Sequence, residues 1–118
     1  MIRILGPDVG IAEVVRDAQN DGHEVSVVPA GATKAESLEL FAETLDFPEW
    51  FGRNLDALAD CLHDFAEQPL DGARARHLVW DGAATLRRDH HDTFEDIAGV
   101  LDEVAQDHDG FVVTILAR

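Results

Sequence analysis

Hydrophobic residues recur along the chain at two spacings, one typical of strands and the other of helices. Short apolar or β-branched runs predict strands at residues 23–28 (HEVSVV), 77–80 (HLVW) and 111–116 (FVVTIL). Between them, apolar residues spaced three and four apart predict amphipathic helices. Strands that alternate with helices are typical of a parallel sheet covered by helices. The pattern therefore predicts an α/β domain with a small three-stranded parallel sheet.

Start and stop signals place the helices outside the central segment. One helix is expected between Pro7 and Gly22. Two more should begin where the capping-box spacing occurs, with Thr33 ahead of Glu36 and with Asp92 ahead of Glu95. A weaker helix is expected over residues 83–89. The opening run, residues 1–5 (MIRIL), is apolar and is expected to form an edge strand or a packed N-terminal arm.

The central segment, residues 47–65 (FPEWFGRNLDALADCLHDF), combines a turn with a strongly patterned helix. Pro48 and Gly52 indicate the turn, and Asn54 is the predicted N-cap of a helix over residues 55–66. At about 100° per residue, four apolar side chains share one stripe of this helix. They are Leu55, Leu58, Leu62 and Phe65. This stripe is expected to be buried.

Another side of the same helix carries three carboxylates, called here the acidic ridge: Asp56, Asp60 and Asp64. Asp56 lies in the first turn, where the helix dipole favours a negative charge, but Asp60 has no such compensation. Like charges four residues apart cost a helix roughly 0.2–0.5 kcal/mol. Only Arg53 stands on the same side of the helix to offset the repulsion between these carboxylates. An acidic ridge beside aromatic residues expected to be exposed, Trp50 and Phe51, indicates a binding surface.

Composition narrows the kind of partner. The chain has 118 residues, enough for one domain, and 24 acidic against 9 basic residues give a net charge of −15. Such a field repels nucleic acids and anionic membranes and attracts basic proteins. No apolar run of about 18 residues and no basic-then-apolar start occurs, so neither a membrane span nor a signal peptide is expected. The single cysteine, Cys61, is expected to be a packing residue in a reducing, cytoplasmic compartment.

Signals of catalysis and of metal binding are weak. The nine glycines stand singly at turns, and the two serines do not form a nucleophile elbow, so no enzyme activity and no cofactor are expected. The acidic ridge with His63 could offer ligands to a cation from one side only. His90 and His91 lie in a polar loop and are expected to be solvated. No metal site is therefore expected, and Glu103, judged by position alone, is an ordinary exposed residue.

The run from Pro48 to Leu62 (PEWFGRNLDALADCL) is similar to the characteristic motif of barstar-family ribonuclease inhibitors. The resemblance extends more loosely from about Val25 to the C-terminus. It implies one domain over residues 1–118, in which 23–118 form the family core and 1–22 an N-terminal addition. The family fold is a three-stranded parallel sheet packed by helices, and its members are intracellular inhibitors of small basic ribonucleases.

The resemblance assigns roles to single residues of this sequence. Asp60 corresponds to the central acid that enters the ribonuclease active site, and Asp56 to the neighbouring acidic contact. Further partner-binding positions follow from the same correspondence: Trp50, which packs on the catalytic histidine; Gly52 in the binding loop; Asn54 as helix cap; and Glu103, which pairs with a basic residue. Two positions depart from the family pattern. Ala59 stands where the namesake has a tryptophan, so some contact area is lost, and Arg53 adds a positive charge to the otherwise acidic binding loop. Both departures bear on which ribonuclease is the cognate partner.

These observations predict a cytoplasmic, monomeric inhibitor that binds a small basic ribonuclease one to one, without contacting nucleic acid or membrane directly. The ribonuclease could be a secreted or toxin-type enzyme of the same cell, which would make this chain its antitoxin or immunity protein. The first alternative is an acidic regulatory module for another basic protein with no ribonuclease target. The second is a metal-dependent enzyme using the Asp56–Asp64 face of the central helix.

Overall fold

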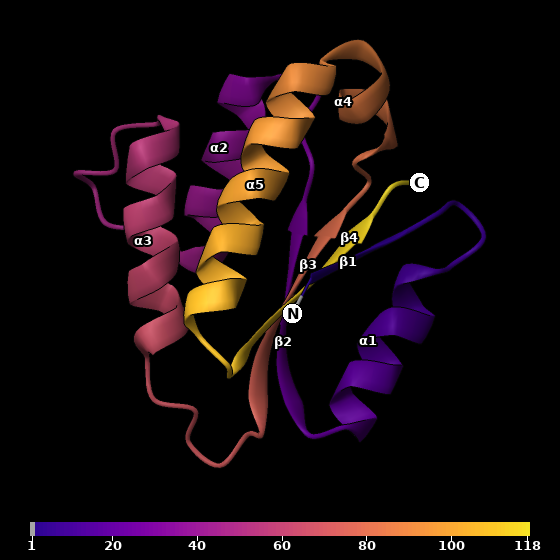
Figure 1. Cartoon of the computed structure of the whole chain (residues 1–118), viewed down its shortest axis with the longest axis vertical. Coiled ribbons are helices and arrows are strands. Elements are labelled where there is room, and N and C mark those ends of the chain that lie inside the picture. Colours follow the sequence, from indigo (N-terminus) through magenta and orange to yellow (C-terminus); the bar gives the residue numbers. More distant parts are fainter. Residues whose placement is uncertain (1) are drawn as a thin grey trace.

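The computed structural model describes residues 2–118 and shows one parallel sheet between two layers of helices (Figure 1). The elements in chain order are β1 (Ile2–Leu5), α1 (Ile11–Asn20), β2 (His23–Pro29), α2 (Lys34–Leu45), α3 (Leu55–Glu67), β3 (Ala75–Asp81), α4 (Ala84–Asp89), α5 (His91–Asp107) and β4 (Phe111–Leu116). The α/β class predicted from the alternating pattern is confirmed.

The sheet has four strands in the order β1-β4-β3-β2, so the predicted count of three is wrong. The missing strand is β1, which pairs with β4 from Ile2 opposite Val113 to Leu5 opposite Leu116. Of the two alternatives for the N-terminal run, the edge strand is therefore the observed one; Met1, its first residue, lies outside the described residues. A run of four residues is too short for its sequence alone to distinguish an edge strand from a packed arm.

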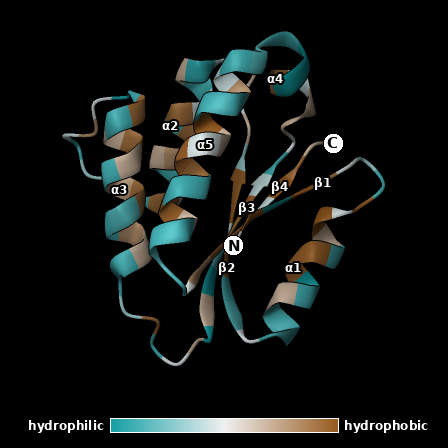
Figure 2. Ribbon diagram, in the orientation of Figure 1, coloured by the Kyte–Doolittle hydropathy of each residue, from teal (hydrophilic) through white to brown (hydrophobic). Residues whose placement is uncertain are grey.

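The two central strands are buried on both faces, which explains why their sequences are mainly apolar. Every residue of β4 is buried, and so is all of β3 except its last residue. Figure 2 shows hydrophobic colours along much of the sheet, with hydrophilic stretches such as the start of β2, and helices whose outer sides are hydrophilic. The two outer strands, β1 and β2, are more exposed, with Ile4 and Val27 among the exposed hydrophobic residues.

Helices α2, α3 and α5 cover one face of the sheet, and α1 covers the other (Figure 1). The larger core lies on the first face, where the fully buried Trp80 stacks on Phe94 with ring centroids 5.6 Å apart. The smaller core joins Val14 of α1 to Val79 and Leu116 of the sheet. Alternation along β3 sends Leu78 and Trp80 to one side and His77 and Val79 to the other.

Helix boundaries agree with most of the predicted signals. Thr33 caps α2 by accepting a hydrogen bond from the Glu36 backbone amide at 3.2 Å. The weak helix expected at residues 83–89 is α4. The predicted cap at Asp92 is wrong, because α5 begins at His91 and the N-cap is His90, which makes no side-chain cap bond. Asp92 instead lies in the first turn, where its charge suits the helix dipole.

Candidate protein-binding site

The loop before α3 is organised by Asn54, which is the N-cap as predicted. Its Oδ1 accepts a hydrogen bond from the Ala57 backbone amide at 2.8 Å, and its Nδ2 donates one to the Gly52 carbonyl at 3.3 Å. A Cβ atom at Gly52 would lie 3.1 Å from Asn54 Nδ2, closer than an ordinary contact. The absence of a side chain at Gly52 therefore lets the loop close tightly onto the start of the helix.

The two aromatic residues of the loop have opposite environments. Trp50 is 63% exposed, as predicted. Phe51 is only 6% exposed, so the expectation of an exposed side chain is wrong. It packs edge-on against Phe47, with centroids 5.2 Å apart, and joins the main core. Phe51 therefore holds the loop against the main core, while Trp50 is exposed and available to a partner.

Arg53 turns away from the acidic ridge. Its backbone is left-handed, with φ of 49°, and its guanidinium forms an ion pair with Glu39 of α2. This hydrogen bond lowers the pKa of the Glu39 carboxyl and raises that of Arg53. The ion-pair partner of Arg53 is thus Glu39, and not Asp56 or Asp60 of the ridge as expected. The positive charge sits beside the loop rather than on the ridge.

The three carboxylates of the acidic ridge, Asp56, Asp60 and Asp64, are all exposed on α3. The opposite side of the helix is buried through Leu58, Cys61, Leu62 and Phe65, while Leu55 is half-buried. Ala59 is half-buried beside the ridge. Burial raises the pKa of the Cys61 thiol, and the nearby Asp64 and Asp60 charges raise it further. Cys61 is therefore a packing residue, as predicted, and is poorly suited to act as a nucleophile.

Glu103 is exposed on α5 and faces α3. One oxygen of its carboxylate, one nitrogen of His63 and one oxygen of Asp107 lie within 4.8 Å of one another. Because His63 follows Asp60 by one turn of α3, Glu103 lies near the continuation of the acidic ridge. The sequence alone did not predict that α3 and α5 lie side by side, as Figure 1 shows.

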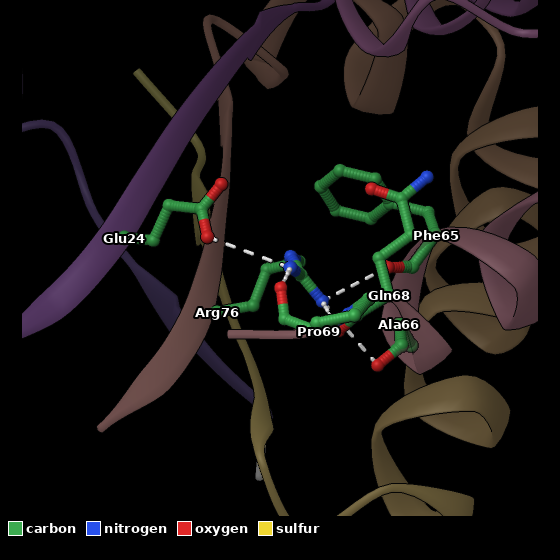
Figure 3. A network of polar contacts seen from close by, with 6 residues as sticks. All are labelled: Glu24, Phe65, Ala66, Gln68, Pro69 and Arg76. Carbon is green, nitrogen blue, oxygen red and sulfur yellow. Dashed lines mark hydrogen bonds and ion pairs between the residues drawn. The ribbon is translucent and has the colours of Figure 1, made fainter. Parts of the chain in front are cut away.

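The far end of α3 is held by a residue that sequence reasoning missed. Arg76 of β3 is 2% exposed and donates hydrogen bonds to four backbone carbonyls at the end of α3 and in the following loop (Figure 3). The acceptors are Phe65 at 3.0 Å, Ala66 at 3.4 Å, Gln68 at 2.9 Å and Pro69 at 3.0 Å. A positive charge at this end also suits the helix dipole. The only signal in the sequence is an arginine directly before an apolar strand.

The geometry defines an acidic α/β domain whose charged helix is fixed at both ends. Its family follows from comparison with known proteins: the chain belongs to the family described as Barstar (barnase inhibitor), whose model matches residues 27–118. The matched part begins within β2, so β1 and α1 precede it.

A curated relative is similar over a short segment. It is "Putative ribonuclease inhibitor YrdF" of Bacillus subtilis (strain 168), 57% identical over 28 residues. The aligned segment covers 24% of this chain and 31% of the relative, so the similarity spans about a third of that protein. Within residues 2–118, no helix is both long enough and apolar enough to cross a membrane.

Proposed function

We propose that this protein is an intracellular inhibitor of a small basic ribonuclease, which it binds one to one and as a monomer. The observation that carries the proposal is the exposed acidic ridge next to exposed Trp50 in a chain of the barnase-inhibitor family. The family and the relative's printed name point to an inhibitor rather than an enzyme. A partner made in the same cell would make this chain an antitoxin or immunity protein.

The proposed mechanism is the occupation of phosphate positions. A ribonuclease active site must hold polyanionic RNA and is therefore lined with cationic side chains. Asp60 would enter that site, with Asp56 one turn earlier and Glu103 on the neighbouring helix as flanking contacts. Carboxylates on a helix offer no phosphodiester bond to cleave, so the enzyme would be blocked without turnover. Because α3 is capped by Asn54 and held at its far end by Arg76, little conformational entropy would be lost on binding.

The remaining residues of the loop have supporting roles in this proposal. Trp50 would pack on the enzyme surface, while Gly52, Phe51 and Asn54 hold the loop in place. Ala59 would leave a shallow area beside the ridge, and Arg53, paired with Glu39, would influence which ribonuclease fits. The net charge of −15 would speed association with a cationic enzyme at low salt.

The test is inhibition of a panel of small basic microbial ribonucleases by the wild type and by Asp60→Ala. Truncating one partner of a buried charge pair costs about 2–5 kcal/mol, so Asp60→Ala should weaken binding at least ~30-fold. Glu13→Ala is the matched control, because it removes the same charge from α1 on the other face of the sheet. Association should slow as salt rises.

The outcomes separate the proposal from its rivals. Stoichiometric inhibition that Asp60→Ala abolishes and Glu13→Ala preserves would support both the function and the site. Inhibition that both variants retain equally would show that the ridge is not the anchor. If no enzyme of the panel is inhibited and a pull-down recovers only basic proteins without nuclease activity, the chain is an acidic regulatory module instead.

A further inference from the structure

A group of potential metal ligands lies where α3 meets the C-terminal part of α5. His63 comes from α3, and Glu103 and Asp107 come from α5, with one ligand atom of each within 4.8 Å of the others. Glu103 and Asp107 are four residues apart and so share one side of α5. Two helices therefore supply donors that converge on one point, which the acidic ridge on a single helix cannot do.

The imidazole of His63 is already oriented for coordination. Its Nδ1 lies 3.0 Å from Nε2 of His108, and its Nε2 faces the Asp107 carboxylate at 3.9 Å. If Nδ1–H donates to His108, the Nε2 lone pair is free to bind a cation. A hydrogen bond to the non-ligating nitrogen is the usual support of metal-binding histidines. The side chain of His63 is 28% exposed, so an ion can still reach it from solvent.

We propose that His63, Glu103 and Asp107 form a binding site for a divalent transition-metal ion of the zinc type, with His108 as the positioning residue. Zinc bonds to histidine nitrogen and carboxylate oxygen are about 2.0–2.2 Å, which puts ligand atoms roughly 3.3 Å apart in a tetrahedron. The ligand atoms lie within 4.8 Å of one another, so the two exposed carboxylates need to close by up to about 1.5 Å. Three protein ligands leave the fourth position for water.

The donor set selects this class of ion over the common alkaline-earth ions. Magnesium and calcium prefer ligand sets made of oxygen, whereas an imidazole nitrogen suits zinc, nickel or copper. The electrostatic environment also favours a cation. The two carboxylates stand next to the acidic ridge in a chain of net charge −15, and a bound divalent ion would relieve their repulsion.

A bound ion would also engage Glu103, one of the proposed ribonuclease contacts. If the inhibitor function holds, zinc should weaken the complex by removing that carboxylate from the interface. This consequence rests on the proposed function, but the site itself does not. The test therefore measures metal binding by the free protein, whose result is independent of any ribonuclease.

The experiment is a competition titration of the metal-free full chain with Zn²⁺ and a chromophoric chelator at pH 7.5, where histidine is mostly neutral. One zinc ion should bind per chain, with at least ~100-fold preference over Mg²⁺ and Ca²⁺. His63→Ala and Asp107→Asn should each weaken zinc binding ~10–100-fold, and His108→Ala by a smaller factor. In the histidine NMR spectrum of the wild type, the His63 ring signals should shift with the first equivalent.

Two controls make the result decisive. Asp96→Asn removes one exposed charge from the same helix away from the cluster and should leave zinc affinity unchanged. The double variant His90→Ala/His91→Ala removes the two histidines at the start of α5 and should also bind zinc normally. If His63→Ala retains wild-type affinity, or if the His90→Ala/His91→Ala variant loses it, the proposed site is wrong. All of these positions except His63 and His108 are exposed, and circular dichroism will verify that each variant is folded.

Discussion

Arg76 holds Phe65 in two ways at once: its Nη1 donates a hydrogen bond to the Phe65 carbonyl at 3.0 Å, and its guanidinium lies over the Phe65 ring, 5.1 Å from the centroid. The same guanidinium also reaches Glu24 of β2 at 3.4 Å. One buried cation therefore joins the end of the proposed binding helix to two strands of the sheet.

Arg76→Met should lower the free energy of unfolding by about 2–4 kcal/mol, because it leaves the carbonyls at the end of α3 without their donor. Urea denaturation followed by circular dichroism measures the loss. Arg16→Met, at an exposed position of α1, should change stability by less than about 0.5 kcal/mol. A loss at Arg76 no larger than at Arg16 would mean that water replaces the guanidinium without penalty.

The contrast between Arg76 and Asn54 shows what the sequence could predict. Asn54 acts on an amide three residues away, so its role follows from local spacing. Arg76 acts on carbonyls seven to eleven residues earlier in the chain, across a loop whose path no local pattern specifies. Strands β3 and β4 were also predictable from local sequence, because burial of their middle residues produces short, mainly apolar runs, LVW in β3 and FVVTIL in β4.

The geometry of the candidate site was predictable in part, for similar reasons. Helical spacing correctly divided α3 into a buried and an exposed side. The burial of Phe51 was missed, because an irregular loop has no periodicity from which to read the direction of a side chain. The approach of Glu103 to His63 was missed too, since it depends on how α3 packs against α5.

The cap of α3 provides the second prediction. Asn54→Ala should destabilise the protein by about 1 kcal/mol, since the Ala57 amide loses its side-chain acceptor. Asn54→Asp should restore most of that loss, because a carboxylate is also a good cap and suits the helix dipole. Thermal or urea denaturation compares the two variants. Equal losses in both would show that the Nδ2 contact to Gly52, rather than the cap, is the important one.

The third prediction concerns His77, which is buried on the α1 side of the sheet. Its Nε2 lies 2.7 Å from Thr114 Oγ1, and its Nδ1 lies 3.1 Å from Nδ1 of His23. Desolvation, followed by the charges of His23 and Arg3, lowers the pKa of His77 from 6.5 to about 4, with Asp21 acting in the opposite direction. The folded protein therefore keeps this imidazole neutral at a pH where the unfolded chain protonates it.

Stability should accordingly be lost as pH falls from about 6.5 to about 4, by up to ~1.4 kcal/mol per pH unit from this residue. Above pH 6.5 both states are neutral at His77, and its contribution is constant. Urea denaturation at half-unit pH steps measures the slope. His77→Gln keeps a polar side chain but cannot titrate, so its slope over this interval should be shallower. Identical slopes would show that other groups cause the acid sensitivity.

The fourth prediction uses the two tryptophans, which differ in environment: Trp50 is 63% exposed and Trp80 is fully buried. In the free protein, acrylamide should quench the fluorescence of the exposed Trp50 and should not quench that of the buried Trp80. Trp50→Phe should remove the quenchable fraction and keep the unfolding signal, because Trp80 packs against Phe41 and Phe94 in the core. The difference between wild type and Trp50→Phe isolates the emission of Trp50, even when a partner has tryptophans of its own.

That difference spectrum tests the proposed interface directly. On binding an inhibited ribonuclease, the Trp50 emission should shift to the blue and become protected from acrylamide, because the indole leaves water. Trp50→Phe should also raise the dissociation constant, since tryptophan is among the residues that dominate interface energies. If a stoichiometric complex leaves the Trp50 spectrum and quenching unchanged, the loop before α3 lies outside the interface. The acidic ridge would then have to bind the enzyme from its Asp64 end, towards Glu103.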